Sequence, residues 1–424
     1  MDKQAIYSLY LQSEGVSTDT RTLKEGQLFF ALSGPNFNGN EFAQEALEKG
    51  AAAAVCDDGQ LKGPRIIQSN NSLLSLQELA RYHRDSLEFP IIGLTGSNGK
   101  TTSKEILVSV LGQKFKVGAT AGNLNNHIGV PLSILNLPRD TQIAIIEMGA
   151  NHQGEIAFLS DIAKPDHGFI TNYGKAHLEG FGGVQGIIKG KSELYENLGR
   201  HGNTAWINIE DPIQKERSEG LKRFFFGDSD QADYTIRRAK ENNEGQVAVT
   251  LDNERIQSQL FGDFNFGNLA VAAALGKYFG LSKEDIKAGI EQYAPRNNRS
   301  QREKGRYNEL IRDYYNANPN SMQGAIENFA RLNGDSKWLI LGDMFELGEE
   351  ARKEHQAIVD LINEYPWERV MLIGEHFAAL DTEHQQLRTT NEAVALMEAE
   401  KPKEKIILLK GSRGMQLERV ADLL

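Results

Sequence analysis

Gly93-Leu-Thr-Gly-Ser-Asn-Gly-Lys-Thr-Thr102 is the stretch of sequence that decides the fold. The apolar, β-prone residues 90–92 precede it, and residues 103–111 follow it with the apolar spacing of a helix. A strand, a glycine turn and a helix N-terminus in this order form a cradle for phosphate, because backbone N–H groups and the helix dipole face the anion. The stretch therefore predicts a nucleotide site within an α/β fold.

Individual positions of this loop account for the chemistry. Gly96 and Gly99 leave room for phosphate oxygens close to the backbone, Lys100 supplies positive charge, and Thr101 offers a hydroxyl to Mg²⁺. Leu94 stands where the common pattern has a glycine, five positions before Gly99. A plain strand-to-helix turn with a surface lysine is the alternative, and the flanking strand and helix disfavour it.

Length, composition and charge limit the class of protein. A chain of 424 residues is long enough for two or three domains, and 40% hydrophobic with 25% charged residues is ordinary for a soluble globular protein. The net charge of −11 argues against nucleic acid or an anionic membrane as the main partner. A phosphate-bearing substrate must therefore be held by local basic residues and helix ends.

Cysteine usage and the N-terminus indicate a cytoplasmic protein. Cys56 is the only cysteine, so the chain forms no internal disulfide and no Cys-rich metal site, and its apolar surroundings predict a core residue. Residues 1–6 lack the apolar stretch of a signal peptide, and no apolar run approaches a membrane span. We therefore expect a cytoplasmic protein without membrane insertion.

The order of strands and helices predicts three α/β domains, at residues 1–88, 89–295 and 296–424. In the first, small domain, strands are expected at 28–32 and 51–55, and helices at 41–49 and 73–84. In the central domain, a parallel sheet of the P-loop ATPase type is expected. Its strand 142–147 ends in Glu147, and His177 follows strand 168–171, so both side chains are expected at the edge of the sheet where ligands bind.

Two further segments complete the expected architecture. Residues 234–261 alternate polar and apolar side chains, which predicts a small antiparallel appendage. After residue 296, strands alternate with helical stretches, which predicts a doubly wound, Rossmann-like third domain. Asn318-Pro319 has the signature of a helix start. The strands of this domain are expected at 309–313, 338–341, 370–373 and 406–409.

Several polar features also have structural interpretations. Glu147 could be a strand-end carboxylate in water, although its place beside the phosphate loop favours metal contact. Taken alone, His177 would be a structural histidine, and Lys191 a solvated lysine of the expected helix 184–197. The segment Ser17-Thr-Asp-Thr-Arg21 is either a solvated turn or a loop that holds a phosphate or a base edge.

Motifs spread over all three expected domains resemble the Mur ligase family. They are the phosphate loop, Glu147-Met-Gly-Ala-Asn-His-Gln-Gly-Glu155, Lys175-Ala-His-Leu-Glu-Gly180, Lys189-Gly-Lys-Ser-Glu193 and Gly262-Asp-Phe-Asn-Phe-Gly-Asn268. Within the family, residues 120–131, 315–321, 341–348 and 410–413 are most similar to the branch that adds D-Ala-D-Ala to UDP-N-acetylmuramoyl-tripeptide.

The resemblance implies a monomeric, ATP-dependent amide ligase of peptidoglycan precursor synthesis. It would use ATP and Mg²⁺, form an acyl phosphate on UDP-N-acetylmuramoyl-tripeptide, transfer the acyl group to D-Ala-D-Ala, and release ADP and phosphate. The N-terminal domain would bind the UDP part of the substrate. The catalytic residues implied by the resemblance are Lys100, Lys191 and His177.

The resemblance also implies contacts for each ligand. The ATP contacts would be Gly96, Asn98, Gly99, Lys100, Thr101, Thr102, Asn265, Asn268 (adenine), Arg299 (γ-phosphate) and Asp313 (ribose). The metal contacts would be Thr101, Glu147, His177 and Lys191, the lysine as a carbamate formed with CO₂. The substrate contacts would be Ser17, Asp19 and Arg21 for UDP, Asn123, Asn125 and Asn126 for the muramoyl-peptide, and Asn316, Asn318, Ser321 and Arg413 for the dipeptide.

The chain departs from the family pattern at three places. Phe264-Asn265 replaces the usual His-Asn, Asn38-Gly-Asn40 replaces Asp-Gly-His, and Arg312 replaces an acidic residue. None of these changes removes a phosphate or metal contact. Another amide ligase of the superfamily, of the muramoyl-peptide or folylpolyglutamate type, and a non-catalytic nucleotide switch remain as alternatives. The motifs at 120–131 and 315–321 argue against the other ligases. The switch is disfavoured by joint retention of Lys100, Glu147, His177 and Lys191.

Overall fold

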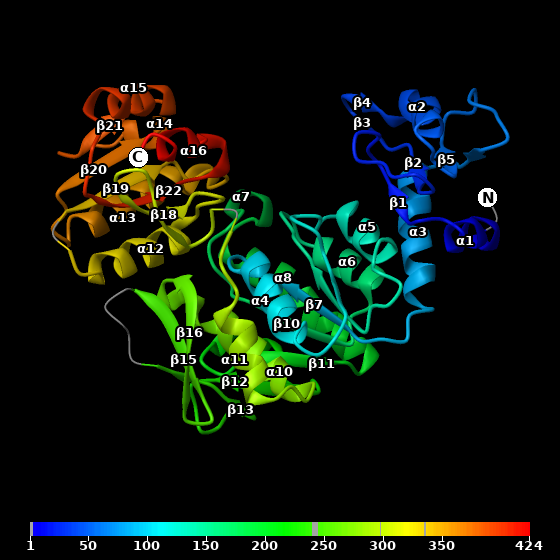
Figure 1. Ribbon diagram of the computed structural model, residues 1–424, viewed down its shortest axis with the longest axis horizontal. Helices are drawn as coiled ribbons and strands as arrows, with labels where there is room; N and C mark the ends of the chain where they lie inside the picture. The colour runs from blue at the N-terminus through cyan, green and yellow to red at the C-terminus, as the bar shows by residue number, and fades with distance from the viewer. Residues whose placement is uncertain (1–2, 240–244, 297, 335) are drawn as a thin grey trace.

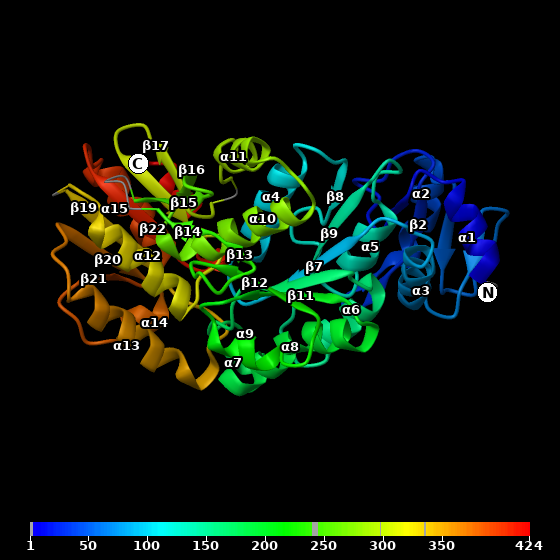
Figure 2. The same cartoon turned by 90° about the horizontal axis from the view of Figure 1, so that it is seen from below.

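The computed structural model describes residues 3–239, 245–296, 298–334 and 336–424. Three α/β regions follow one another along the long axis of the molecule, and a view turned by 90° shows the same succession (Figures 1 and 2). This arrangement confirms the expected fold class of a small N-terminal region, a central parallel sheet and a Rossmann-like third region. Among the helices of the described residues, none has the length and apolarity needed to span a bilayer.

The N-terminal region is built on a parallel sheet of four strands. Their order is β1 (Val16–Ser17), β2 (Leu28–Phe30), β5 (Ala53–Cys56) and β6 (Ile66–Gln68). The remaining elements are α1 (Lys3–Leu11), β3 (Ser33–Gly34), β4 (Phe37–Asn38), η1 (Gly39–Phe42), α2 (Ala43–Glu48) and α3 (Ser72–Arg84). Cys56 is fully buried, as expected of a core residue. Arg84 fastens this region to the central one, because its guanidinium donates to the carbonyl oxygens of Ala163 and Lys164 (both 2.9 Å) and to Asp166 (2.8 Å).

The central region contains a parallel sheet of seven strands. Their order is β13 (Tyr234–Thr235), β12 (Arg223–Gly227), β11 (Thr204–Asn208), β10 (His167–Ile170), β7 (Ile91–Thr95), β9 (Ile143–Glu147) and β8 (Val117–Ala119). Every residue of β7 and β9 is buried, as expected of strands whose two faces are both covered by helices. The helices are α4 (Lys100–Leu111), α5 (Gly129–Leu135), α6 (Glu155–Ala163), α7 (Leu178–Phe181), α8 (Val184–His201), α9 (Pro212–Arg217), η2 (Asp263–Asn265), α10 (Phe266–Tyr278) and α11 (Lys283–Glu291).

The antiparallel appendage is shorter than the sequence pattern predicted. It consists of β14 (Arg237–Arg238), β15 (Gln246–Leu251) and β16 (Glu254–Phe261). Tyr234–Thr235 instead pairs in parallel with β12 at the edge of the central sheet. Residues 240–244 of the expected appendage lie outside the described residues. Alternation of polar and apolar side chains is the same for an edge strand and a hairpin strand, so the pattern could not assign the pairing partner.

The third region is a six-stranded sheet with helices on both sides. The strand order is β17 (Gln301–Lys304), β18 (Glu309–Asp313), β22 (Ile406–Lys410), β19 (Lys337–Gly342), β20 (Arg369–Ile373) and β21 (Gln385–Leu387). Only β17 runs antiparallel to its neighbour. The helices are α12 (Pro319–Arg331), η3 (Gly348–Glu350), α13 (Ala351–Ile362), α14 (Glu375–Ala378), α15 (Thr390–Glu400), η4 (Arg413–Met415) and α16 (Glu418–Ala421).

Candidate functional site

A cleft of about 1030 Å³ lies where the carboxyl edge of the central sheet faces the third region. It collects most of the residues expected at the site from three separate parts of the chain. The expected residues that line it are Asn98, Gly99, Lys100, Thr101, Thr102, Asn123, Asn125, Asn126, Glu147, His177, Asn265, Asn268, Arg299, Asp313, Asn316 and Ser321. The expected residues outside this lining are Ser17, Asp19, Arg21, Gly96, Lys191, Asn318 and Arg413.

The phosphate loop joins β7 to α4 in a conformation that requires glycine. Gly96 has φ +143°, and a Cβ there would lie 1.9 Å from the Thr171 hydroxyl oxygen. Gly99 has φ +80° at the N-cap of α4, so the first N–H groups of this helix remain available to an anion. The Lys100 ammonium donates to the carbonyl oxygens of Gly96 (2.7 Å) and Ser97 (3.3 Å). Burial lowers the pKa of Lys100, and Glu147 opposes that shift.

Glu147 ends β9 beside this loop and is almost fully buried. Its Oε1 accepts hydrogen bonds from Asn125 Nδ2 (2.7 Å) and from the Thr101 hydroxyl (3.3 Å). Within the described part of the chain, its Oε2 has no hydrogen-bond donor, and the nearest cation is Lys104 Nζ at 3.9 Å. A buried carboxylate oxygen without a donor is costly unless a ligand completes its contacts.

This oxygen and the Thr101 hydroxyl suit Mg²⁺. Magnesium prefers oxygen ligands and is often held by one or two carboxylates together with substrate phosphates. Among the described residues, no cluster of three or more His, Cys, Asp or Glu side chains could hold a metal ion. The oxygens of Glu147 and Thr101 therefore fit one Mg²⁺ only if phosphate oxygens supply further ligands.

The other two expected metal contacts have different partners. His177 has φ +54°, and its Nδ1 lies 2.5 Å from Glu346 Oε2 of the third region. Lys191 on α8 is fully buried, donates to the carbonyl oxygen of Ala150 (3.2 Å), and lies over the ring of Phe181. Burial and the nearby Lys100 lower the pKa of Lys191 well below its usual value. Its amine therefore lies beneath the lining of the cleft in a setting that favours the neutral form.

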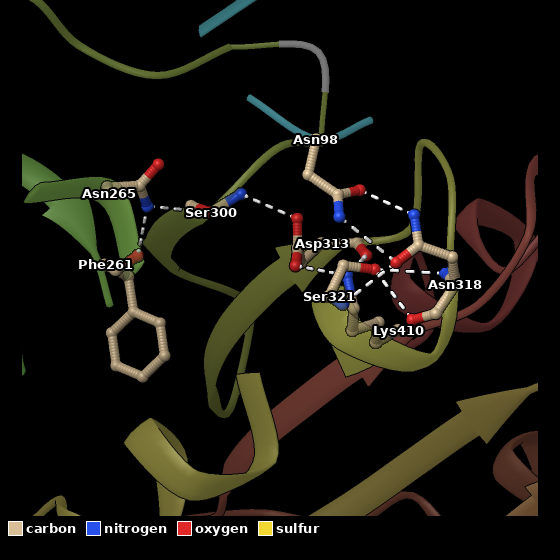
Figure 3. Close-up of polar contacts among 8 residues, drawn as sticks. All are labelled: Asn98, Phe261, Asn265, Ser300, Asp313, Asn318, Ser321 and Lys410. Atoms are coloured by element: carbon tan, nitrogen blue, oxygen red, sulfur yellow. Dashed lines mark hydrogen bonds and ion pairs between the residues drawn. The ribbon is translucent and has the colours of Figure 1, made fainter. Parts of the chain in front are cut away.

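A chain of hydrogen bonds connects the start of α10 to the strand ends of the third region (Figure 3). Asn265 Nδ2 donates to the Ser300 hydroxyl (3.3 Å), and the Ser300 N–H donates to Asp313 Oδ1 (3.0 Å). Lys410 Nζ lies 2.6 Å from the other carboxylate oxygen of Asp313. Asn268 accepts from the Ser103 hydroxyl (2.8 Å), which holds its amide against the phosphate loop. Both oxygens of Asp313 are thus already engaged.

The tip of the phosphate loop is joined to the third region by a pair of amides. Asn98 Nδ2 donates to Asn318 Oδ1 (3.2 Å), and Asn318 Nδ2 donates to Asn98 Oδ1 (2.6 Å) (Figure 3). Asn318 Oδ1 also accepts the N–H of Ser321 (3.0 Å) and thereby caps α12, as its sequence signature predicted. The Asn318 side chain is therefore occupied by a helix cap and by a contact between regions.

Two arginines of the expected site meet on one aromatic ring. The Cζ atom of Arg299 lies 3.7 Å from the ring centroid of Tyr315, and that of Arg413 lies 5.1 Å from the same centroid. Such cation–π contacts orient a guanidinium while leaving its N–H groups free. Tyr315 thus connects the position expected for the γ-phosphate with the position expected for the dipeptide.

The Ser17–Arg21 loop lies apart from the cleft, after β1 of the N-terminal sheet. Arg21 Nη2 lies 2.6 Å from Asp19 Oδ2, and this ion pair lowers the pKa of Asp19 to about 2. The Ser17 hydroxyl donates to the carbonyl oxygen of Asp19 (3.1 Å). These contacts would be made by a solvated turn as well as by a ligand loop, so the expected UDP contacts stay a prediction.

The residues alone did not single out several groups that line the cleft or contact its lining. Tyr315 and Lys410 line it, whereas Lys104 and Glu346 contact the lining residues Glu147 and His177. In chain order the four are Lys104, Tyr315, Glu346 and Lys410. The last three belong to motifs that the sequence contains, so those motifs were the available signal. Lys104 follows the loop on an ordinary helical stretch, and nothing in the local sequence indicates that its ammonium is buried.

Three family models match successive parts of the chain. They are described as "Mur ligase family, catalytic domain" (residues 12–88), "Mur ligase middle domain" (94–276) and "Mur ligase, glutamate ligase domain" (298–413). The matches follow the order of the three regions of the fold.

Two curated relatives are similar over nearly the whole chain, and both are named UDP-N-acetylmuramoyl-tripeptide–D-alanyl-D-alanine ligase. The protein of Bacillus subtilis (strain 168) is 35% identical, with 96% of this chain and 92% of that protein covered. The protein of Escherichia coli (strain K12) is 33% identical, with 97% and 93% covered.

Solved structures agree with this similarity. MurF from Acinetobacter baumannii superposes with a TM-score of 0.86 at 29% identity, covering 98% of this chain and 97% of that one. The MurF ligase of Thermotoga maritima, solved in complex with ADP, has a TM-score of 0.85 at 26% identity and the same coverage.

Proposed function

The chain belongs to the Mur ligase family, and we propose that it joins D-Ala-D-Ala to UDP-N-acetylmuramoyl-tripeptide with conversion of ATP to ADP and phosphate. The observation that carries this proposal is one cleft in which the phosphate loop and the 315–321 segment of the third region meet. Full-length similarity to ligases of this name supports the choice of substrates. The reaction belongs to peptidoglycan precursor synthesis, on which cell-wall growth, cell shape and division depend.

The first step activates the peptide carboxylate. A carboxylate is a poor acyl donor, so one of its oxygens attacks the γ-phosphorus of ATP, the bond to the bridging oxygen breaks, and an acyl phosphate and ADP form. The transferred group is held in place, and its charge is neutralised, by the Lys100 ammonium and the Arg299 guanidinium. Both residues line the cleft.

A bound Mg²⁺ would supply charge neutralisation at the phosphate oxygens. Glu147 and Thr101 are the residues that would hold it, because their oxygens meet beside the phosphate loop. Within the chain, Asn125 fixes Glu147 from the other side, so that the carboxylate keeps one orientation. Lys191, as a carbamate, would add an anionic group beneath the cleft. His177 would contact a metal ion only after its imidazole separates from Glu346.

The second step forms the amide. The free amine of D-Ala-D-Ala attacks the acyl carbon, a tetrahedral intermediate forms, and phosphate leaves as the carbonyl is restored. Arg413 would bind the dipeptide carboxylate in bidentate fashion, with Asn316 and Ser321 beside it. Closure of the cleft around both substrates would keep water away from the acyl phosphate.

We assign the reaction to a monomer in the cytoplasm, where ATP is available. Asn123, Asn125 and Asn126 would contact the muramoyl-peptide, and the Ser17–Arg21 loop would bind the distant UDP end. Asp313 and Asn268 would contact the ribose and adenine of ATP. Binding energy from the UDP end then helps position the reacting carboxylate far away from it.

The test is an ADP-release assay with purified protein, ATP, Mg²⁺ and UDP-N-acetylmuramoyl-tripeptide. We expect steady turnover only when D-Ala-D-Ala is also present, with a product heavier than the acceptor by one dipeptide residue pair. Single amino acids should be poor substrates, because they cannot reach both Arg413 and the acyl phosphate. Equal rates with L-lysine, diaminopimelate or glutamate would contradict the assignment, and absence of any ADP release would contradict the reaction class.

A further inference from the structure

A second lysine of α4 is buried one turn after the phosphate-loop lysine. Lys104 is 3% exposed, and its ammonium donates to the backbone carbonyl oxygens of Thr120 (2.9 Å) and Gly122 (3.0 Å). Its third neighbour is Glu147 Oε2 at 3.9 Å. An ammonium is removed from water only at considerable cost, and here three oxygen partners offset that cost.

The partners of this ammonium belong to two parts of the expected site. The two carbonyl groups belong to the first residues of segment 120–126, which carries the asparagines expected at the muramoyl-peptide. Glu147 is the carboxylate expected at Mg²⁺. A second connection joins the same two parts, because Asn125 Nδ2 donates to Glu147 Oε1 (2.7 Å) and the Gly149 N–H donates to the carbonyl oxygen of Asn125 (2.8 Å).

We propose that Lys104 is a positioning residue that fixes residues 120–126 against Glu147, so that one buried ammonium sets both the acceptor-peptide wall and the metal-facing carboxylate. Lys104 is not among the described residues that line the cleft, so it acts through these neighbours and not by touching substrate. The kinetic part of the proposal rests on the proposed ligase function. The structural part, the ordering of residues 120–126, does not.

Lys104 holds this segment from inside the protein. Without the ammonium, the carbonyl groups of Thr120 and Gly122 would lose their donor, and Glu147 Oε2 would lose its nearest cation. The segment would then sample other conformations, since the backbone oxygen of the buried Thr120 would lose its partner and that of the exposed Gly122 would be released to water. Binding of the acceptor peptide would suffer most, because it needs several asparagines of one segment in place at once.

The test compares Lys104→Met with Lys114→Met. Methionine is unbranched and only one heavy atom shorter than lysine, and it lacks the charge and the donors. Lys114 is a matched control, because it also donates to two backbone carbonyl groups, those of Phe279 (3.4 Å) and Gly280 (2.7 Å), but at an exposed position away from the cleft. Amide hydrogen exchange of residues 120–126 and steady-state kinetics are measured on the full chain.

We expect Lys104→Met to raise the KM for UDP-N-acetylmuramoyl-tripeptide about 10- to 100-fold, by analogy with the effect of groups that orient metal-ligating side chains through hydrogen bonds. The KM for ATP should change much less. Exchange of residues 120–126 should become faster, and Lys114→Met should leave the kinetics and this exchange unchanged. Unchanged exchange of this segment in folded Lys104→Met would overturn the proposal. An unchanged KM for the acceptor in the folded variant would also overturn it.

Lys104→Gln keeps one donor and carries the same test if Lys104→Met does not fold. We expect intermediate exchange and an intermediate KM for the acceptor, and wild-type values of both would overturn the proposal. The exchange measurement needs no substrate. Faster exchange in the variant together with an inactive wild-type protein would therefore reject the ligase assignment and retain the positioning role of Lys104.

Discussion

The two walls of the cleft differ in how their polar groups are used. On the central wall, within the described residues, Glu147 Oε2 lacks a hydrogen-bond donor and the Lys100 ammonium donates only to carbonyl groups of its own loop. On the wall of the third region, both oxygens of Asp313 are engaged, Asn318 is paired with Asn98, and Glu346 is paired with His177.

This difference separates two tasks. The polar groups of the central wall can therefore bind the charged groups of a substrate or a metal ion. Groups of the third wall are bound to one another and to the central wall, so they control how the two regions sit together. Substitutions in the central wall should therefore reduce the rate of the chemical steps, and substitutions in the third wall should alter binding and the position of the regions.

The largest expected effect is that of Lys100→Ala, which removes the cation of the central wall. We expect kcat to fall by about 10²–10³-fold or more, because loss of one transition-state charge contact typically costs about 2.7–4 kcal/mol. Turnover is measured by ADP release, and the melting temperature shows whether the fold is retained. Near-normal turnover of the folded variant would show that the loop does not bind the reacting phosphates.

Substitution of Lys191 tests whether a buried residue behind the central wall contributes to the reaction. We expect Lys191→Ala to lose about 10- to 100-fold or more of the activity, as for groups behind a metal site. A small carboxylic acid in the buffer should restore part of it by supplying the anion that a carbamate would provide.

Lys191→Arg should remain inactive with or without the acid, since a guanidinium is a permanent cation and cannot form this carbamate. The comparison of the two variants is made in the same assay, with and without the added acid. An active arginine variant would rule out the carbamate and assign Lys191 a role as a cation.

A smaller effect is expected at Tyr315, which connects the two walls through Arg299 and Arg413. Tyr315→Leu removes both cation–π contacts and should raise the KM for ATP and for D-Ala-D-Ala about 2- to 5-fold each, as expected from 0.5–1 kcal/mol per contact. Tyr315→Phe keeps the ring and should behave as the wild type. If the phenylalanine variant is as impaired as the leucine variant, the hydroxyl and not the ring is the relevant group.

The smallest effect is expected at Asn318, which lies outside the cleft lining and joins the third region to the tip of the phosphate loop. Asn318→Ala should lower the free energy of unfolding by about 1 kcal/mol through loss of the cap of α12. Thr389→Ala is a matched control, because Thr389 caps α15 in the same region and accepts the N–H of Glu392 (3.3 Å).

Both cap variants should lose similar stability in urea unfolding, but only Asn318→Ala should change the KM for ATP, because only Asn318 touches the phosphate loop. The expected change is about 2-fold, in keeping with the modest net energy of one hydrogen-bonded contact. Identical kinetics of the two variants would show that the pair with Asn98 does not couple the regions.

The fold was largely predictable because its strongest elements are local. The strand, glycine loop and helix at 90–111 and the capped helix starting at Asn318-Pro319 are encoded by residues close in sequence. The pairing of Tyr234–Thr235 with β12 was not predictable, because it depends on a neighbour that local alternation does not specify.

The candidate site was predictable only where a motif marks it. The phosphate loop and Glu147 stand at strand ends, and the parallel sheet brings such ends together. Contacts between regions, such as Glu346 with His177, join positions far apart in sequence and have no local signature. The burial of Lys104 likewise depends on the backbone carbonyl groups of residues 120–122, and no spacing rule for a helix reveals it.

The burial of Cys56 has a practical consequence for spectroscopy. Desolvation, helped by Asp57 and Asp58, raises the pKa of this thiol to about 11, so only about one molecule in ten thousand carries the reactive thiolate at pH 7. The native cysteine should therefore react very slowly with maleimide dyes.

A pair of dyes can then be attached at chosen positions without first removing a native thiol. Glu196→Cys on α8 and Glu398→Cys on α15 are exposed positions in the central and third regions. Energy transfer between dyes at these two positions would report the separation of the regions in solution as each substrate is added. The course of cleft closure can thus be followed one molecule at a time in a chain that keeps its own cysteine.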